Sequence, residues 1–281
     1  MELPEVEVMR RDLEKAFVGR RIASVEVRPQ KNAMRVISRH HRTRKEFGKR
    51  LEGRKVTGVE RKGKYLLVRL DDGGVLVVHF GMSGRLFRGT KRHELAPHTH
   101  VVLEFQKGGD LRFIDPRAIG RLFVTTMDGL NGVKELSKVG IDPLEHGFTW
   151  PEFSEKLTER KMKLKPLLMD QEFVSGLGNI YSDEVLFLAG LRHDRLSNEL
   201  SSQEVRRLYR AIQEVVQEAI RFRGTTLEDR AYVDLHGKPG EHQSELRVYG
   251  RRGLPCRRCR SPIETVKVSG RNSFFCPVCQ T

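Results

Sequence analysis

Long hydrophobic runs are absent from this sequence of 281 residues. No segment approaches the roughly 18 consecutive apolar residues that a membrane-spanning helix requires. The N-terminus carries Glu2, Glu5 and Glu7, where a secretory signal has a basic segment followed by an apolar one. We therefore expect neither a membrane span nor export, and we expect a cytoplasmic location.

Acidic residues are scarce relative to basic ones. The sequence has 37 Asp and Glu against 52 Lys and Arg, which gives a formal net charge of +15 and an isoelectric point near 9.9. An enzyme acting on small neutral metabolites does not need this excess, whereas a polyanion-binding protein does, because each cation placed on a phosphate releases condensed counterions. Residues 20–64 and 247–281 hold much of the excess and suggest a cleft or clamp. The alternative is that the charge only keeps a basic protein soluble.

Cysteine is also scarce, and its placement is informative. All four cysteines lie in the last 26 residues, so a disulfide framework is excluded and a reducing compartment is expected. The spacing Cys256-x2-Cys259 and Cys276-x2-Cys279 is typical of a structural zinc ribbon with four thiolate ligands. It leaves no open coordination position, so Zn²⁺ would stabilise a hairpin and not activate water. A redox pair is the alternative. His98-x-His100, expected on one face of a strand, is a weaker metal candidate because no third ligand is evident.

The hydrophobic pattern predicts an α+β fold. Residues 4–18 repeat apolar positions at helical spacing with Gly19 just beyond, which predicts a helix near the N-terminus. Alternating or β-branched runs between Ile22 and Thr125, among them a single run from Gly74 to Phe87, predict strands. With turns at residues 72–74 and 108–110, they favour an antiparallel β-sandwich. The pattern then becomes helical. Ser201 and Glu204 have capping-box spacing ahead of a long amphipathic helix.

These changes in pattern predict four segments. They are a β-sandwich domain at 1–126, a helical domain at 127–230, a loop and linker at 231–246, and a zinc hairpin at 247–281.

Several motifs in order resemble the formamidopyrimidine-DNA glycosylase (Fpg/Nei) family of base-excision repair enzymes. They cover almost the whole chain and are, in sequence order, Glu2-Leu3-Pro4-Glu5-Val6-Glu7, Lys62-Gly63-Lys64-Tyr65-Leu66-Leu67, His79-Phe80-Gly81-Met82-Ser83-Gly84, Asp115-Pro116-Arg117, Lys165-Pro166-Leu167-Leu168-Met169-Asp170-Gln171, Gly176-Leu177-Gly178-Asn179-Ile180-Tyr181, Gly224-Thr225-Thr226-Leu227, Gly237-Lys238-Pro239-Gly240 and the cysteine ribbon. The resemblance implies an N-terminal β-sandwich, a helix-two-turn-helix domain and a zinc hairpin. It also implies a monomer that binds damaged double-stranded DNA in a bacterial cytoplasm, associated with the nucleoid.

The resemblance also implies roles for individual residues. The amine of residue 1 would attack the sugar C1′ of an extruded nucleotide to form a Schiff base, with Glu2 as general acid and base. Lys64 would assist β-elimination, and Arg271 on the zinc hairpin δ-elimination. Residues expected to contact DNA are His98, Arg117, Arg160, Asn179, Met82 and Ile119. Asn179, at the start of a helix after Gly176-x-Gly178, would offer side-chain and backbone N–H donors to phosphate. It could instead belong to an ordinary glycine-rich helix start, and Met82 to the core.

Three departures from the family pattern fall at functional positions. Glu2 directly follows Met1, without the family's proline, so we expect the primary amine of Met1 to stand in for a proline nucleophile, with reduced or altered lyase chemistry. Arg117 is followed by Ala118 and Ile119, where the family has a second Arg and a wedge Phe. The residues before the strand read Pro97-His98-Thr99-His100, where the family has Lys-His-Asp-His.

The leading hypothesis is a bifunctional DNA glycosylase and AP lyase that removes 8-oxoguanine and formamidopyrimidines. The alternative is a catalytically impaired or inactive protein of the same fold that binds lesions or abasic sites. A third hypothesis, a zinc-ribbon RNA-binding protein, is disfavoured by the absence of an aromatic stacking platform, since the chain has 1 Trp and 5 Tyr. No organic cofactor is suggested.

Overall fold

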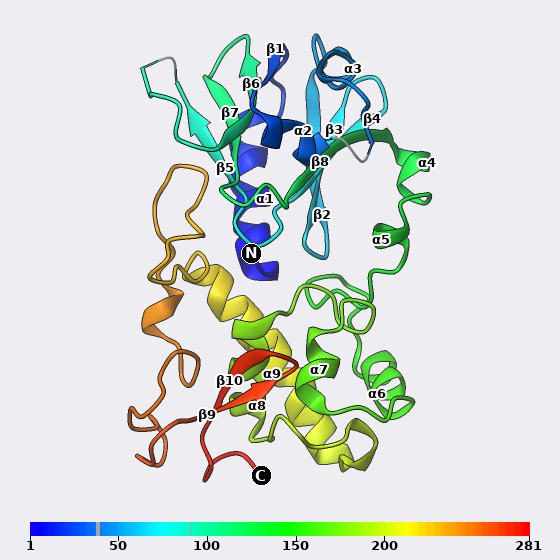
Figure 1. The fold of residues 1–281 in the computed structure, drawn as a ribbon. Coiled ribbons are helices and arrows are strands. Elements are labelled where there is room, and N and C mark those ends of the chain that lie inside the picture. The colour runs from blue at the N-terminus through cyan, green and yellow to red at the C-terminus, as the bar shows by residue number, and fades with distance from the viewer. Residues whose placement is uncertain (38–39, 91) are drawn as a thin grey trace. The chain divides into compact units, whose positions relative to one another are not determined.

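The computed structural model describes residues 1–37, 40–90 and 92–281 (Figure 1). Within them the chain forms two compact units. The first consists of Met1, Glu5–Ser137 and Arg223–Glu241, and the second of Glu2–Pro4, Lys138–Phe222 and His242–Thr281. Both helices and sheets contribute, which confirms the predicted α+β class.

The first unit contains an antiparallel β-sandwich, as predicted. One sheet has the order β1-β6-β7-β5 and the other β2-β3-β4-β8. The strands are β1 (Ile22–Val27), β2 (Val56–Lys62), β3 (Tyr65–Leu70), β4 (Gly74–His79), β5 (Arg85–Gly89), β6 (Thr99–Phe105), β7 (Asp110–Ile114) and β8 (Arg121–Thr126). The apolar run from Gly74 to Phe87 is two strands in different sheets, because the chain turns between His79 and Arg85.

The N-terminal helix completes the core of this unit. Helix α1 (Leu3–Phe17) buries Val6, Met9, Leu13 and Phe17 against side chains from both sheets, as its helical spacing predicted. The remaining helices of this unit are short: α2 (Lys31–Ile37), α3 (Arg44–Lys49), α4 (Met127–Leu130) and α5 (Lys134–Ser137).

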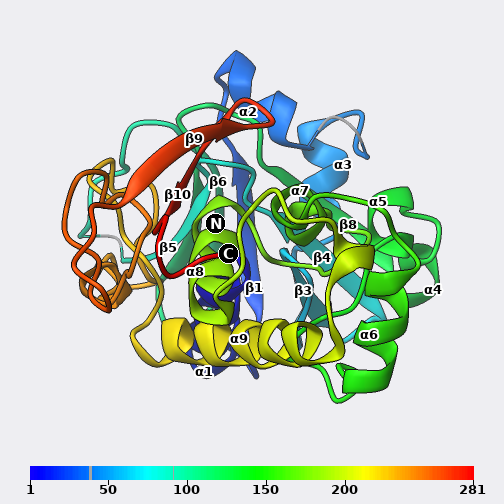
Figure 2. The same ribbon diagram turned by 90° about the horizontal axis from the view of Figure 1, so that it is seen from below.

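The second unit is helical and ends in a two-stranded hairpin. Its elements are α6 (Trp150–Thr158), α7 (Leu164–Met169), α8 (Asn179–Ala189), the 3-10 turns η1 (Ser197–Glu199) and η2 (His242–Ser244), α9 (Ser202–Arg221), β9 (Glu264–Val268) and β10 (Arg271–Phe275). Helix α9 begins with the predicted capping box between Ser201 and Glu204. Helix α8 packs against both α9 and β10 (Figure 2). Among the described residues, no helix combines the length and apolar character that crossing a membrane requires.

Candidate active site and zinc site

Glu2 is fastened to the beginning of helix α8. Its carboxylate accepts hydrogen bonds from the backbone N–H groups of Gly178 at 2.7 Å, Ile180 at 2.9 Å and Tyr181 at 3.3 Å. N–H groups at a helix N-terminus have no partner within the helix and favour an anion. The carboxylate is thereby held in one orientation, as a residue that moves a proton at a defined atom must be.

Gly178 allows this close approach. A Cβ atom built on Gly178 would lie 2.5 Å from the carboxyl carbon of Glu2, a distance at which one group must shift. The sequence pattern suggested that the glycine-rich helix start supplies backbone donors for phosphate. The structure shows that three backbone N–H groups of this segment are bonded to Glu2.

Asn179 connects the start of α8 to the C-terminal hairpin. Its side-chain nitrogen donates to the hydroxyl of Tyr249 at 3.3 Å and to the carbonyl of Asn272 at 3.1 Å. Asn272 follows Arg271, which is exposed at the first position of β10. Asn179 and the tip that carries Arg271 are therefore neighbours in the second unit.

A buried ion pair fixes the same hairpin to α8. The Lys165 ammonium donates to Asp183 at 2.6 Å, and Asp183 also accepts from the Ser273 hydroxyl at 2.7 Å and the Phe274 N–H at 2.9 Å. Lys165 and Asp183 are almost fully buried, so removing one partner would leave an uncompensated charge. Lys165 stands in one of the family motifs, but no pattern in the sequence indicates that its partner is Asp183.

Two predicted catalytic residues, Met1 and Lys64, belong to the first unit and lie near His79. Lys64 is half-buried in the turn between β2 and β3, and Met1 packs against the hydrophobic core. Burial, followed by the positive charges of Arg121, Lys64 and the N-terminal amine, lowers the pKa of His79 to about 4. His79 is therefore neutral at pH 7. Because the charges of both the amine and Lys64 contribute to the lowered pKa, both groups lie within electrostatic range of His79.

Three predicted DNA-contact side chains project from two adjoining loops of the first unit. Met82 is 64% exposed and Ile119 is 42% exposed, so neither belongs to the core, which excludes the alternative considered for Met82. The Arg117 guanidinium lies 3.4 Å from the Met82 sulfur. Large apolar side chains are costly to leave in water, which makes this cluster a candidate contact surface.

Asp115 holds the two loops in place, and sequence reasoning missed this role. It is fully buried, and its carboxylate accepts from the Ser83 hydroxyl at 2.5 Å and from the N–H groups of Ile119 at 2.9 Å and Gly120 at 2.8 Å. Its place in the Asp-Pro-Arg motif, ahead of a tight turn, was the signal available.

His98 and His100 do not share a strand face, contrary to the prediction. His98 precedes β6 and has a left-handed φ of 62°, while His100 is buried and bonds through Nε2 to the Asp115 carbonyl at 2.8 Å. In the described residues, the cysteines form the only group of three or more potential ligands. The weaker metal candidate is therefore not supported, and His98 stays an exposed DNA-contact prediction.

Arg160 is engaged within the second unit. Its guanidinium donates to Asp170 at 3.0 Å and lies 5.6 Å from the centre of the Phe173 ring. A role in DNA contact would use the remaining face of the guanidinium and stays a prediction.

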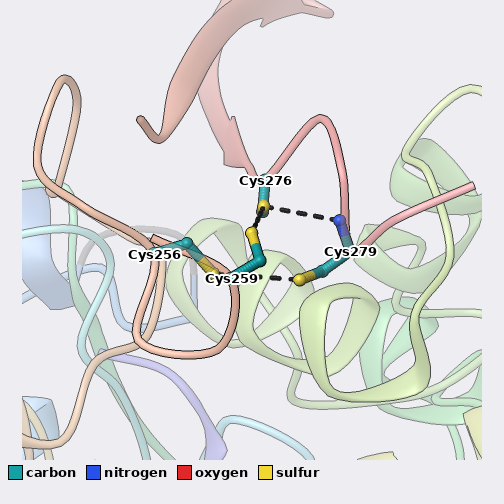
Figure 3. A group of neighbouring side chains, drawn as sticks. All are labelled: Cys256, Cys259, Cys276 and Cys279. Atoms are coloured by element: carbon teal, nitrogen blue, oxygen red, sulfur yellow. Dashed lines mark hydrogen bonds between the residues drawn. The ribbon is translucent and has the colours of Figure 1, made fainter. Parts of the chain in front are cut away.

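The four cysteine sulfurs form a zinc site (Figure 3). All lie within 4.8 Å of one another, with 3.9 Å between Cys256 and Cys279 and 3.4 Å between Cys259 and Cys276. These separations suit a tetrahedral ion with Zn–S bonds of about 2.3 Å. Hydrogen bonds from Ser261 lower the pKa of the Cys259 thiol to about 6, whereas burial raises the pKa of the Cys276 and Cys279 thiols. Binding of Zn²⁺ at this site therefore involves the release of thiol protons.

Comparisons with known protein families match most of the chain. Three family models match: the formamidopyrimidine-DNA glycosylase N-terminal domain at residues 1–122, its H2TH domain at 139–231, and the zinc finger found in FPG and IleRS at 253–281. The chain belongs to the formamidopyrimidine-DNA glycosylase family. The cluster of four cysteines is accordingly the family's structural zinc site, with one Zn²⁺ held by Cys256, Cys259, Cys276 and Cys279.

Individual members of the family are similar to this chain over nearly its full length. A formamidopyrimidine-DNA glycosylase of Pelotomaculum thermopropionicum is 42% identical over 99% of this chain and 98% of its own. The crystal structure of the MutM (FPG) protein of Thermus thermophilus has a TM-score of 0.88 at 40% identity, covering 100% and 98% of the two chains. Lactococcus lactis Fpg in complex with abasic-site DNA has a TM-score of 0.90 at 35% identity and full coverage of both.

Proposed function

We propose that this protein is a base-excision repair enzyme that removes oxidised purines, namely 8-oxoguanine and formamidopyrimidines, from duplex DNA and then cleaves the abasic strand. Its relatives carry the glycosylase name, and the Lactococcus lactis relative binds abasic-site DNA. The net charge of +15 supports a DNA substrate. The observation that carries the proposal is the carboxylate of Glu2, fixed by three N–H groups and covalently adjacent to the amine of residue 1.

In the proposed reaction, the nitrogen of the residue 1 amine attacks C1′ of the extruded nucleotide, and the bond between C1′ and the base breaks. The departing base takes a proton from solvent, while the Glu2 carboxylate accepts one proton from the attacking amine and passes it to the ring oxygen as the sugar ring opens. Loss of the remaining amine proton gives an imine. Lys64 then assists removal of a C2′ proton, which breaks the C3′–O3′ bond.

Other predicted residues hold the DNA in this proposal. Arg271 and Asn179 bind phosphates beside the extruded nucleotide and Arg271 assists the second elimination, while His98 and Arg160 contact the backbone. Met82, Arg117 and Ile119 fill the space that the extruded base leaves, Arg117 by hydrogen bonding to the orphaned base. Ile119 supplies an apolar wedge without the stacking surface of an aromatic ring.

Single-turnover release of 8-oxoguanine paired with cytosine tests the proposal. We expect wild-type protein to cleave this duplex and to leave an undamaged duplex intact. Glu2→Gln should slow release by about 100-fold, since loss of a positioned acid or base typically costs about 10²- to 10⁴-fold. The matched control is Glu14→Gln, an exposed carboxylate on α1 that pairs only with Arg10 among the described residues. Tight, lesion-selective binding by the wild type without any cleavage would instead support the lesion-binding alternative.

A further inference from the structure

A cavity of about 530 Å³ lies within the first unit, beside the outer face of the sheet that contains β5 and β7. The register of β5 and β7 explains which side chains face the cavity. Arg85 pairs with Ile114 and Phe87 with Arg112, and these four side chains share the face opposite to the core residues Leu86 and Phe113. The volume falls within the roughly 300–1,000 Å³ typical of small-molecule sites. None of the residues assigned above to catalysis, DNA contact or zinc lines it.

The segment after α9 forms one wall of this cavity. The Arg88 N–H donates to the Leu235 carbonyl at 2.8 Å, which fastens the segment along edge strand β5, as Figure 1 shows. Val233 from this segment is buried at the wall, and Arg230 stands at its rim with a left-handed φ of 47°. The Arg230 N–H donates to the Leu227 carbonyl at 2.9 Å, so a local turn stabilises this conformation.

Three guanidinium groups at the cavity lack a protein anion. Within the part of the chain that the structure describes, the side chains of Arg85, Arg92 and Arg230 form neither an ion pair nor a hydrogen bond. A fourth, Arg112, is saturated, because it pairs with Asp110 and donates to the carbonyls of Thr90, His93 and Glu94. Guanidinium groups match the oxygen geometry of phosphate and carboxylate.

The floor of the cavity is apolar and partly aromatic. Phe87 is half-buried, with its ring 5.8 Å from that of His93 at an angle of 62°, and Ile114 and Val233 lie beside it. One acidic side chain, Glu94, also lines the cavity and offers an acceptor for an amino or imino group. Aromatic, cationic and acceptor groups therefore lie around a single space.

We propose that this cavity binds a nucleoside monophosphate, with the base against Phe87 and His93 and the phosphate between Arg85, Arg92 and Arg230. The ligand is a flat aromatic body with a terminal phosphate, a chemistry that both a free nucleotide and a 5′-phosphorylated DNA strand end carry. No residue assigned to base excision lines this cavity, and its occupancy does not depend on the proposed glycosylase activity.

Calorimetric titration of the zinc-loaded, full-length protein with dGMP tests the proposal. We expect one saturable site per chain, and binding of deoxyguanosine or inorganic phosphate at least about tenfold weaker, because each lacks one half of the recognised chemistry. Arg85→Gln should weaken dGMP binding by about tenfold or more. Arg28→Gln is the matched control, since Arg28 is a cation at the end of the same sheet that pairs with Glu26. Arg92→Gln, at an exposed position, provides a second variant if Arg85→Gln fails to fold.

The outcomes separate the possibilities. Saturable dGMP binding lost in Arg85→Gln or Arg92→Gln but kept in Arg28→Gln supports the site. Binding of dGMP alone identifies the free nucleotide, whereas additional binding of a 5′-phosphorylated trinucleotide identifies a strand end. Absence of saturable binding, equal loss in the control, or loss only in Arg271→Ala would overturn the proposal, the last because it places the nucleotide at the zinc hairpin.

Discussion

At the scale of single residues, Asp115 connects the exposed cluster of Met82, Arg117 and Ile119 to the rest of the sandwich. One carboxylate accepts from a hydroxyl on one loop and from three N–H groups on the other, those of Arg117, Ile119 and Gly120. The exposed side chains keep their positions because a buried neighbour fixes both loops. The family resemblance points to the three exposed residues, whereas the positions of their loops depend on the buried Asp115.

Asp115→Asn tests this dependence. The amide offers one acceptor where the carboxylate offers two, so a buried N–H is left unsatisfied, at a cost of about 1–3 kcal/mol. We expect the free energy of unfolding in urea to fall by that amount and discrimination of lesion from normal duplex to weaken. Asp128→Asn, at an exposed position of α4, is the control. An unchanged stability and selectivity would show that Asp115 does not organise the loops.

His79 predicts a pH dependence of stability. Its pKa is about 4 in the folded protein and about 6.5 when unfolded, so between these values the unfolded state binds more protons. Stability from this group is complete above about pH 6.5 and is lost as the pH falls towards 4. Urea unfolding at about pH 7 and pH 4.5 should show wild type losing about 2 kcal/mol more than His79→Phe. Equal losses would refute the assignment.

At the scale of elements, the Glu2 carboxylate is in direct contact with the beginning of α8. This contact is possible because Gly178 has no side chain there. Gly178→Ala places a methyl group where the Glu2 carboxyl lies. A displacement of about 1 Å at a reacting group can lower a rate by about 100-fold. We expect a loss of this size in base release, while thermal stability falls little.

Gly147→Ala is the matched control for this change, since nothing lies within 4 Å of a Cβ built there. Equal activity of Gly178→Ala and Gly147→Ala would show that the anchoring of Glu2 has no catalytic importance.

We expect the structure of the zinc hairpin to depend on its metal ion. Cys276→Ser, or removal of metal by a chelator, should reduce the zinc content from one ion per chain to nearly none. The segment that carries Arg271 should then lose its structure, since zinc binding and folding are coupled in such sites. Elemental analysis and DNA-binding titrations would measure both effects. A metal-free protein with unchanged affinity would contradict a role for the hairpin in binding.

How much could be predicted from sequence also depends on scale. Helix α1, the capping box of α9, the strands and the zinc ligands follow local patterns of spacing and were predicted. The split of the Gly74–Phe87 run between two sheets was not, because periodicity within a strand does not specify its partner. Asp183 and the donors to Glu2 were missed for the same reason, since most of their partners lie tens of residues away or more. For Asp115, the contact that could not be read locally is the one to Ser83 on the other loop.

At the scale of the whole molecule, the charge of +15 predicts binding that is strongly dependent on salt. If about six to ten phosphates are contacted, affinity for duplex DNA should fall by about 10³- to 10⁵-fold between about 50 and 200 mM salt. Fluorescence anisotropy over this range gives the slope. A nearly flat dependence would indicate that the excess charge serves solubility and not DNA binding.

The central claim is that this chain forms a covalent imine with a damaged nucleotide through the amine of residue 1. Borohydride reduction during reaction with a duplex carrying 8-oxoguanine opposite cytosine, followed by mass mapping of the crosslinked peptide, tests it most directly. The account predicts an adduct on the peptide that contains Met1 and Glu2, at the α-amine. Absence of an adduct under conditions of tight binding, or an adduct on a lysine such as Lys64, would contradict it.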